Sequence, residues 1–274
     1  MKIANNRLVS EQDSENIIHE TTSNKGGNIV PQFIIIHFTA GREAESSVSW
    51  FKNPIAKASA HLVIGRDGKI FQLIDFNKKA WHAGESQWAN WKGFNDFSIG
   101  IELENPRRLN KIGDKLFSWF SKEYPNDNVI ELIHKHEDKP SYWMSYTEKQ
   151  IQSCVDVCKQ LLTKYPIIDV LGHDDIAPYR KNDPGPMFPM ESFRSKLLGR
   201  QDDTGDIFKT NTNAVNVRKG AGMQFESIVK LQKDIEVEFI KSNNGWFYVF
   251  VAEKPIDGDE VIYGWIHNSL LIKE

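Results

Sequence analysis

The 274-residue chain contains only two cysteines, no long apolar run and almost no net charge. Two cysteines are too few for the disulfide framework of a small secreted protein. Cys154 and Cys158 lie on one predicted helix face beside apolar residues, which predicts buried thiols rather than a redox or metal-binding pair. The formal charge is −3, from 34 basic and 37 acidic residues. Because this balance lacks the positive surface that attracts a phosphate backbone, we expect no nucleic acid as a partner.

Long hydrophobic segments are also missing. No stretch of about 18 apolar residues occurs, so no membrane-spanning helix is expected. Residues 1–20 lack the continuous apolar core of a secretory signal. We therefore expect a protein that is cytoplasmic as synthesised, with any release or delivery from the cell using a route other than Sec.

Apolar residues make up 40% of the chain, enough for one large domain and one small one. Residues 1–200 mix strand and helix patterns, which predicts an α/β domain with a mixed central β-sheet flanked by helices. Within it, residues 106–146 are predicted as a long loop region that forms part of a groove. A polar linker follows at 201–206. Residues 208–274 contain short strand patterns and no competing helix, which predicts a small all-β barrel.

Two strand patterns and one helix pattern stand out in the larger domain. The continuous apolar run Phe33–His37 predicts a strand buried on both faces, and residues 97–104 alternate between apolar and polar side chains. The best helix pattern covers 148–165, with Thr147 and Gln150 as a capping box. Further predicted elements are helices over 46–53 and 190–198, a hairpin joining 61–64 to 69–74, and a strand over 167–173.

Two histidines end apolar strands of this domain. His37 and His173 each occupy the carboxyl end of a predicted strand, where ligands of α/β sheets gather. Either one alone also fits a histidine bonded to a loop carbonyl. Asp183 follows His173 on a loop rich in proline and glycine, and together the three favour a metal site. Two imidazoles and a carboxylate, with a position left for water, are typical of a catalytic zinc.

Glu102 and Lys181 are the candidate catalytic residues. Glu102 lies on the polar face of the strand over 97–104. If that face is inside the domain, a carboxylate there is a candidate general base, because its burial is costly; if the face is solvated, Glu102 is a surface acid. Lys181 precedes Asp183 by two residues and would stabilise an oxyanion beside a metal, or else it is simply solvated.

Aromatic residues and further histidines form two other groups. Trp81, Trp88 and Trp91, with His82, could stack on sugar rings or simply pack in the core or at its rim. His134 and His136 resemble a zinc-binding tract only by composition. We expect them to lie in a solvated loop.

Five blocks, in order along the chain, resemble one known family. They are Ile35–His37, Ser59–Gly68, Trp81–Gly84, Asn95–Glu104 and Gly172–Pro186. Together they resemble the zinc-dependent N-acetylmuramoyl-L-alanine amidases of the type-2 amidase family, whose fold is shared by peptidoglycan recognition proteins. The resemblance covers about residues 30–198. It implies a peptidoglycan or muropeptide substrate, cleaved at the amide between N-acetylmuramic acid and L-alanine.

The resemblance also implies roles for individual residues. It implies Zn²⁺ held by His37, His173 and Asp183, with Glu102 as general base and then acid and Lys181 holding the developing oxyanion. The same blocks imply substrate contacts, and these would be made by His61, Arg66, Trp81, His82 and Asn95. Because the region 106–146 is longer than in a minimal family member, the range of substrates stays open.

The C-terminal region resembles bacterial SH3-like domains. The similar segments are Asn216–Gly220, Asn244–Val249 and Gly264–His267. Such modules often bind wall peptides. Two other functions remain open: a peptidoglycan-binding module that has lost its metal, and a metal-free glycosidase in which Glu102 pairs with Glu104 or Asp183.

Overall fold

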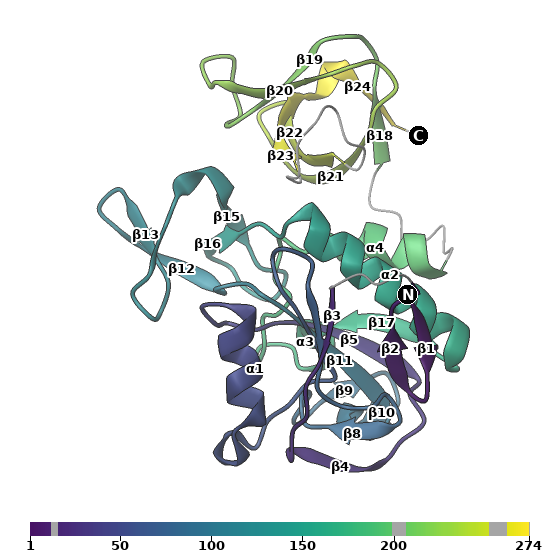
Figure 1. Ribbon diagram of the computed structural model, residues 1–274. Helices are drawn as coiled ribbons and strands as arrows, with labels where there is room; N and C mark the ends of the chain where they lie inside the picture. Colours follow the sequence, from purple (N-terminus) through teal and green to yellow (C-terminus); the bar gives the residue numbers. More distant parts are fainter. Residues whose placement is uncertain (12–15, 199–206, 252–261, 274) are drawn as a thin grey trace. The chain divides into compact units, whose positions relative to one another are not determined.

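The structure is a computed structural model that describes residues 1–11, 16–198, 207–251 and 262–273 (Figure 1). The chain forms two compact units, Met1–Met190 and Glu191–Glu274, which divide at the start of α4 (Met190–Leu198). The predicted linker 201–206 lies outside the described residues, and the domain bounds 1–200 and 208–274 stay predictions. No helix of the described residues has the length and apolar character needed to cross a membrane.

A six-stranded mixed sheet forms the centre of the first unit, in the order β17-β5-β11-β6-β7-β3. Its strands are β17 (Asp169–Gly172), β5 (Phe33–Phe38), β11 (Ser98–Leu103), β6 (Leu62–Ile64), β7 (Ile70–Gln72) and β3 (Ile17–His19). The first four run parallel, whereas β7 is antiparallel to β6. All residues of β5 and β11 are buried, which confirms the strand predicted as buried on both faces.

Two helices pack against this sheet. α1 (Ala44–Lys52) contributes Val48 and Phe51 to a core cluster with Val63 and Phe71 of the sheet. α2 (Glu148–Lys164) begins with the predicted capping box, and its Gln150 side chain donates to two carbonyls near the ends of β6 and β11. The α/β class with helices around a mixed sheet is confirmed (Figure 1). Cys154 and Cys158 are buried free thiols, as predicted.

The region 106–146 is a second sheet, and the prediction of a loop there is wrong. Its order is β14-β13-β12-β16-β15, with β12 (Arg108–Ile112), β13 (Lys115–Phe117), β14 (Glu123–Tyr124), β15 (Val129–Ile133) and β16 (Pro140–Met144). Its buried apolar residues include a small cluster around Leu109, Leu116 and Tyr124, together with Leu132 and Trp143. Cations on β12 lie over aromatic rings of β16, Arg108 over Trp143 and Lys111 over Tyr142. These charged positions obscure the strand pattern in the sequence.

The remaining short elements of the first unit are mostly hairpins that the sequence patterns did not predict. They are β1 (Lys2–Ala4) with β2 (Arg7–Val9), β4 (Lys25–Asn28) with β8 (Lys78–Ala80), and β9 (Gln87–Trp88) with β10 (Trp91–Lys92). The short helices are α3 (His173–Ile176), η1 (Pro54–Ala56), η2 (Phe94–Asp96) and η3 (Asn126–Asn128).

The second unit is all-β beyond α4, as predicted. One seven-stranded curved antiparallel sheet has the order β20-β19-β23-β22-β21-β18-β24 (Figure 1). Its strands are β18 (Ile207–Thr210), β19 (Val215–Arg218), β20 (Ser227–Leu231), β21 (Glu236–Asn243), β22 (Trp246–Val251), β23 (Ile262–His267) and β24 (Leu271–Lys273). The short helix η5 (Asn268–Leu270) connects β23 to β24. Its apolar core includes Val217, Val249 and Ile266.

Candidate active site

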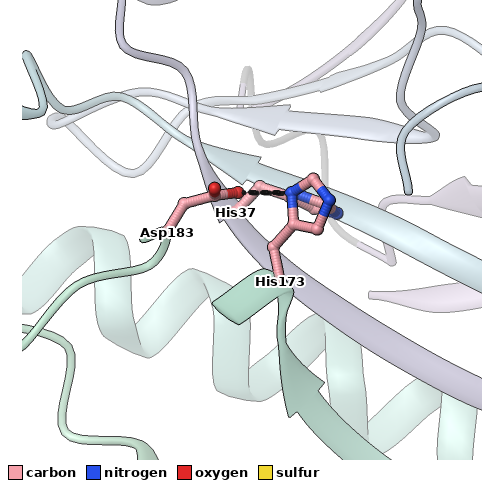
Figure 2. A group of neighbouring side chains, drawn as sticks. All are labelled: His37, His173 and Asp183. Atoms are coloured by element: carbon pink, nitrogen blue, oxygen red, sulfur yellow. Dashed lines mark hydrogen bonds and ion pairs between the residues drawn. The ribbon is translucent and has the colours of Figure 1, made fainter. Parts of the chain in front are cut away.

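Three side chains converge at the carboxyl end of the central sheet. His37 lies near the end of β5, His173 begins α3 directly after the neighbouring parallel strand β17, and Asp183 lies on the following loop. The Nδ1 atoms of the two histidines are 2.9 Å apart, and Asp183 Oδ2 lies 2.9 Å from the first and 2.8 Å from the second (Figure 2). All three residues are buried. The predicted ligand set therefore meets at one point.

The opposite ring nitrogens of the two histidines are already engaged. His173 Nε2 lies 3.0 Å from the Ala83 carbonyl and must carry the proton that bonds it. His37 Nε2 lies 3.0 Å from His82 Nδ1, and His82 Nε2 lies 3.2 Å from Ser98 Oγ. The Ser98 hydroxyl donates to a carbonyl, so the consistent assignment has each histidine donating through Nε2. This leaves both Nδ1 lone pairs directed at Asp183.

This arrangement fits a metal ion. Two imidazole lone pairs and a carboxylate oxygen face each other within 2.9 Å, and a cation between three such acceptors would be strongly stabilised. Ligand atoms around a tetrahedral zinc lie about 3.4 Å apart, given bonds of about 2.1 Å, so only a small outward movement would admit the ion. Histidines that donate their second nitrogen to a neighbouring acceptor are usual at such sites.

The electrostatics of His37 and Asp183 keep these two residues in the ligating forms. Burial, with a contribution from His173, lowers the pKa of His37 from 6.5 to about 4, so its imidazole is neutral at pH 7. Burial alone would raise the pKa of Asp183, but His173 and His37 hold that pKa well below its ordinary value. At neutral pH, Asp183 is therefore ionised and the His37 ring is neutral, which are the states that a metal requires of these two ligands.

Glu102 stands beside this cluster on the adjacent strand. It pairs in register with His37 across the parallel strands β11 and β5, so both side chains project from the same face of the sheet. Its carboxyl is buried, and among the described residues Oε2 has no hydrogen-bond partner. Burial, and then the charge of Asp183, raises the pKa of Glu102 well above its usual value, while Lys181 lowers it. The interpretation of Glu102 as a surface acid is therefore wrong.

These residues border a cavity of about 890 Å³. His37, Glu102, His173, Lys181 and Asp183 all contribute to its lining. So do Phe38 and Phe51 and four further aromatic residues, namely Trp50, Trp81, Trp119 and Phe120. Trp119 and Phe120 come from the segment 106–146, which therefore does form part of a groove, although it is a sheet rather than a loop. Of these four aromatics, only Trp81 was singled out from the sequence.

Three of the implied substrate contacts are absent from the lining of this cavity. His61 is fully buried, with Nε2 2.8 Å from the Lys78 carbonyl and Nδ1 accepting from the Gly100 amide. The Asn95 side chain accepts from the amides of His82 and Ala83 and so holds that loop. Arg66 donates to the Ser145 carbonyl. Since their polar atoms bond the main chain, these residues support the site rather than face its cavity.

His82 lines the cavity, but both of its ring nitrogens are bonded inside the protein. Its ring occupies space that Gly100 leaves free, because a Cβ at Gly100 would lie 2.4 Å from His82 Cγ. The sequence argument missed this pairing. A glycine within an alternating strand can indicate such a close approach, and that was the available signal.

The other two tryptophans and the second histidine pair have structural positions. Trp91 packs against Phe33 and Phe97, and Trp88 pairs with it across a short hairpin. His134 and His136 lie in the loop between β15 and β16, as expected, but this loop is not solvated at His134, and His136 is half-buried.

His134 is buried, with Nε2 2.9 Å from Asp174 Oδ2, and His136 Nε2 lies 3.0 Å from the Asp174 carbonyl. These bonds attach the second sheet to α3. Among the described residues, the one group with metal-binding spacing is His37, His173 and Asp183.

A mixed sheet with two imidazoles, a carboxylate and a buried acid at its carboxyl edge defines a candidate mononuclear metal site. Residues 26–186, more than half of the chain, match the family described as N-acetylmuramoyl-L-alanine amidase. The chain belongs to this family.

Several characterised proteins are similar to it. The 1,6-anhydro-N-acetylmuramyl-L-alanine amidase AmpD of Citrobacter freundii is 37% identical over 141 residues, which are 51% of this chain and 57% of that protein. The N-acetylmuramoyl-L-alanine amidase AmiD of Escherichia coli K12 is 32% identical over 179 residues, 62% of this chain and 54% of that one. The chain thus spans just over half the length of the curated relatives it matches.

Among solved structures, this chain is similar to the complex of Escherichia coli AmiD with the substrate anhydro-N-acetylmuramic acid-L-Ala-D-gamma-Glu-L-Lys. It shares 28% sequence identity with this chain and has a TM-score of 0.47, over 61% of this chain and 57% of that one.

Proposed function

We propose that this protein is a zinc-dependent N-acetylmuramoyl-L-alanine amidase that hydrolyses the amide between N-acetylmuramic acid and L-alanine in peptidoglycan or muropeptides. The observation that carries the proposal is the convergence of His37 Nδ1, His173 Nδ1 and Asp183 Oδ2 within 2.9 Å beside the buried carboxyl of Glu102. Membership of the amidase family and the named activities of AmpD and AmiD support it.

His37, His173 and Asp183 would hold the ion. When bound, zinc supplies a Lewis acid that polarises a carbonyl and acidifies a water. Glu102 takes the proton of the attacking water, because its carboxylate is buried beside the cluster and has one oxygen without a hydrogen-bond partner in the described part of the chain. Because the pKa of Glu102 is raised toward neutral pH, the carboxyl holds this proton more tightly than an ordinary glutamate would. The same residue can then return the proton to the nitrogen of the departing L-alanine.

Lys181 is the second catalytic residue of the proposal. Its side chain borders the cavity, and its positive charge acts on both His37 and Glu102. An ammonium at this position stabilises the negative charge that develops on the carbonyl oxygen during attack. In this proposal the Glu102 carboxylate transfers the proton and the Lys181 ammonium stabilises the oxyanion.

Trp81, Trp50 and Trp119 supply the substrate-binding walls of the proposal. All three border the cavity, and Trp50 and Trp119 remain 54% and 65% exposed. Exposed indole faces are suited to packing on sugar rings. His82 has a different role, which is to orient His37 by accepting the hydrogen bond of His37 Nε2 at His82 Nδ1.

The C-terminal unit is proposed to be an SH3-like domain that tethers the enzyme to the cell wall. Its SH3-like sequence segments coincide with β19, β22 and β23, which are adjacent in the sheet. A weak wall-binding module raises the local concentration of substrate near the active site.

Product analysis separates the proposed reaction from its alternatives. The protein is incubated with a muropeptide, with zinc or with a chelator, and the products are identified by mass spectrometry. Zinc-dependent release of a peptide with a free L-alanine amine supports the amidase. New reducing ends without free peptide would mean a glycosidase, and binding without any cleavage would mean a recognition module. Glu104 is a poor glycosidase partner because its carboxylate accepts from the amides of Ala44 and Arg66.

A further inference from the structure

A second cavity of about 300 Å³ adjoins the first. Arg107, Arg180, Lys181 and Asn182 border both cavities, so the two meet at these residues. The rest of its lining comes from the second sheet and the loop after α3, and consists of Arg108, His134, His136, Glu137 and Tyr179. The cavity lies at the low end of the size range of small-ligand sites, directly next to the proposed catalytic residues.

Positive charge dominates this second cavity. Its lining holds four cations, Arg107, Arg108, Arg180 and Lys181, against the single carboxylate of Glu137. Glu137 is paired with Arg108, and Arg180 donates to the carbonyls of Ala83 and Glu85. Within the described ranges, Arg107 and Lys181 have no carboxylate partner at ion-pair distance. Arg108 Nε is buried and has no acceptor there either.

The backbone holds Arg107 in place at the junction of the two cavities. Asn105 accepts from the Arg107 amide through Oδ1 and donates to the Met144 carbonyl through Nδ2. Arg107 has a φ of 73°, a conformation that a non-glycine residue keeps only where its surroundings impose it, often at functional sites. Because Arg107 follows Glu102 closely along the chain, the same segment carries the proposed general base and this unpaired guanidinium.

We propose that the second cavity binds a free carboxylate of the substrate's stem peptide, with Arg107 as its main partner. This inference rests on the proposed amidase function. The peptide continues from L-alanine on the leaving-group side of the scissile amide. Its second residue is D-glutamate linked through the γ-carboxyl, so the α-carboxylate is free, and the last residue adds a terminal carboxylate. A guanidinium recognises either group through paired hydrogen bonds.

The test compares three substrates. The first is anhydro-N-acetylmuramic acid-L-Ala-D-γ-Glu-L-Lys, the second has the α-carboxylate of D-glutamate converted to an amide, and the third has the terminal carboxylate amidated. Peptide release by the full chain with zinc gives kcat/KM for each. We expect amidation of the recognised carboxylate to lower kcat/KM about ten- to a hundredfold, mainly through KM, since a hydrogen bond to a charged group is lost. The amide that causes the loss identifies which carboxylate is bound.

Variants connect this preference to the cavity. Arg107→Gln should lower kcat/KM on the first substrate by a similar factor and remove the preference for the carboxylate. Arg107→Gly, which accepts the positive φ without strain, should do the same. Arg42 is the matched control, because it is a cation that borders only the larger of the two cavities, and Arg42→Gln should keep the preference.

Two results would overturn the proposal. One is equal kcat/KM on all three substrates for the unmodified protein. The other is an Arg107→Gln variant that loses activity equally on carboxylate and amide substrates. In either case the amidase function would stand. Failure to release peptide from any of the three substrates would contradict the proposed function itself.

Discussion

A single methyl group placed at Gly100 should disturb the candidate metal site. A Cβ there would lie 2.4 Å from Cγ, 2.7 Å from Nδ1 and 2.8 Å from Cδ2 of the His82 ring, so the ring must move. Gly100 lies in the regular strand β11 and does not have the positive φ that only glycine favours. The effect of Gly100→Ala is therefore steric, and overpacking of this kind costs about 1–3 kcal/mol of unfolding free energy.

The same displacement removes the acceptor of His37 Nε2. Loss of a hydrogen bond that orients a metal ligand lowers metal affinity about 10- to 100-fold, which is about 1.4–2.7 kcal/mol. Urea unfolding of the metal-free protein measures the steric cost. Competition with a chromophoric chelator measures zinc affinity, independently of activity.

A double-mutant cycle with His82→Ala isolates the mechanism. Because the three atoms nearest to the added Cβ all belong to His82, Gly100→Ala should cost little once that ring is gone. The two substitutions should therefore be strongly non-additive, with a coupling of about 1–3 kcal/mol in stability. Additive costs, or Gly100→Ala protein that binds zinc as tightly as the unmodified chain, would refute this account of how His37 is oriented.

Three further outcomes are expected. Glu102→Gln should retain zinc and lose about 100- to 10,000-fold in kcat, because an amide cannot accept the water proton; full activity would assign the base elsewhere. Burial lowers the pKa of His61 from 6.5 to about 4. Between these values the unfolded chain binds more protons than the folded one, so stability should fall with falling pH, by at most about 1.4 kcal/mol per unit for this group. In the His61→Gln variant, the free energy of unfolding, measured with urea and chelator present, should fall less steeply as the pH is lowered. An unchanged dependence on pH would contradict this role of His61. Removal of residues 208–274, with folding checked by circular dichroism, should slow peptide release from insoluble sacculi and leave soluble muropeptides unaffected; equal effects on both would argue against a wall-binding module.

The candidate metal site could be predicted from the sequence in part, because two of its residues end strands, while the full ligand set was implied by the family resemblance. His37 and His173 end apolar runs that are typical of buried strands, and parallel neighbours bring their carboxyl ends to one edge. The capping box of α2 is likewise a local pattern. Each strand and the cap are determined by residues that lie close together in the chain.

Contacts between distant segments were beyond such reasoning. His82 bonds His37 only because Gly100 leaves room for its ring, and His61 is buried by main-chain groups of Lys78 and Gly100. The sheet within 106–146 escaped prediction because its strands are short and carry charges that stack on aromatic rings. The basic cavity depends on that sheet, so it too could be found only in the folded structure.

The most direct test of the account is a zinc titration of chelator-treated protein acting on a soluble muropeptide, with peptide release followed by mass spectrometry. We predict no release without metal and a rise to a plateau at one zinc per chain. Asp183→Ala protein should show no comparable rise at one equivalent, because the carboxylate that faces both histidines is gone. Undiminished peptide release after complete removal of metal would contradict the central claim.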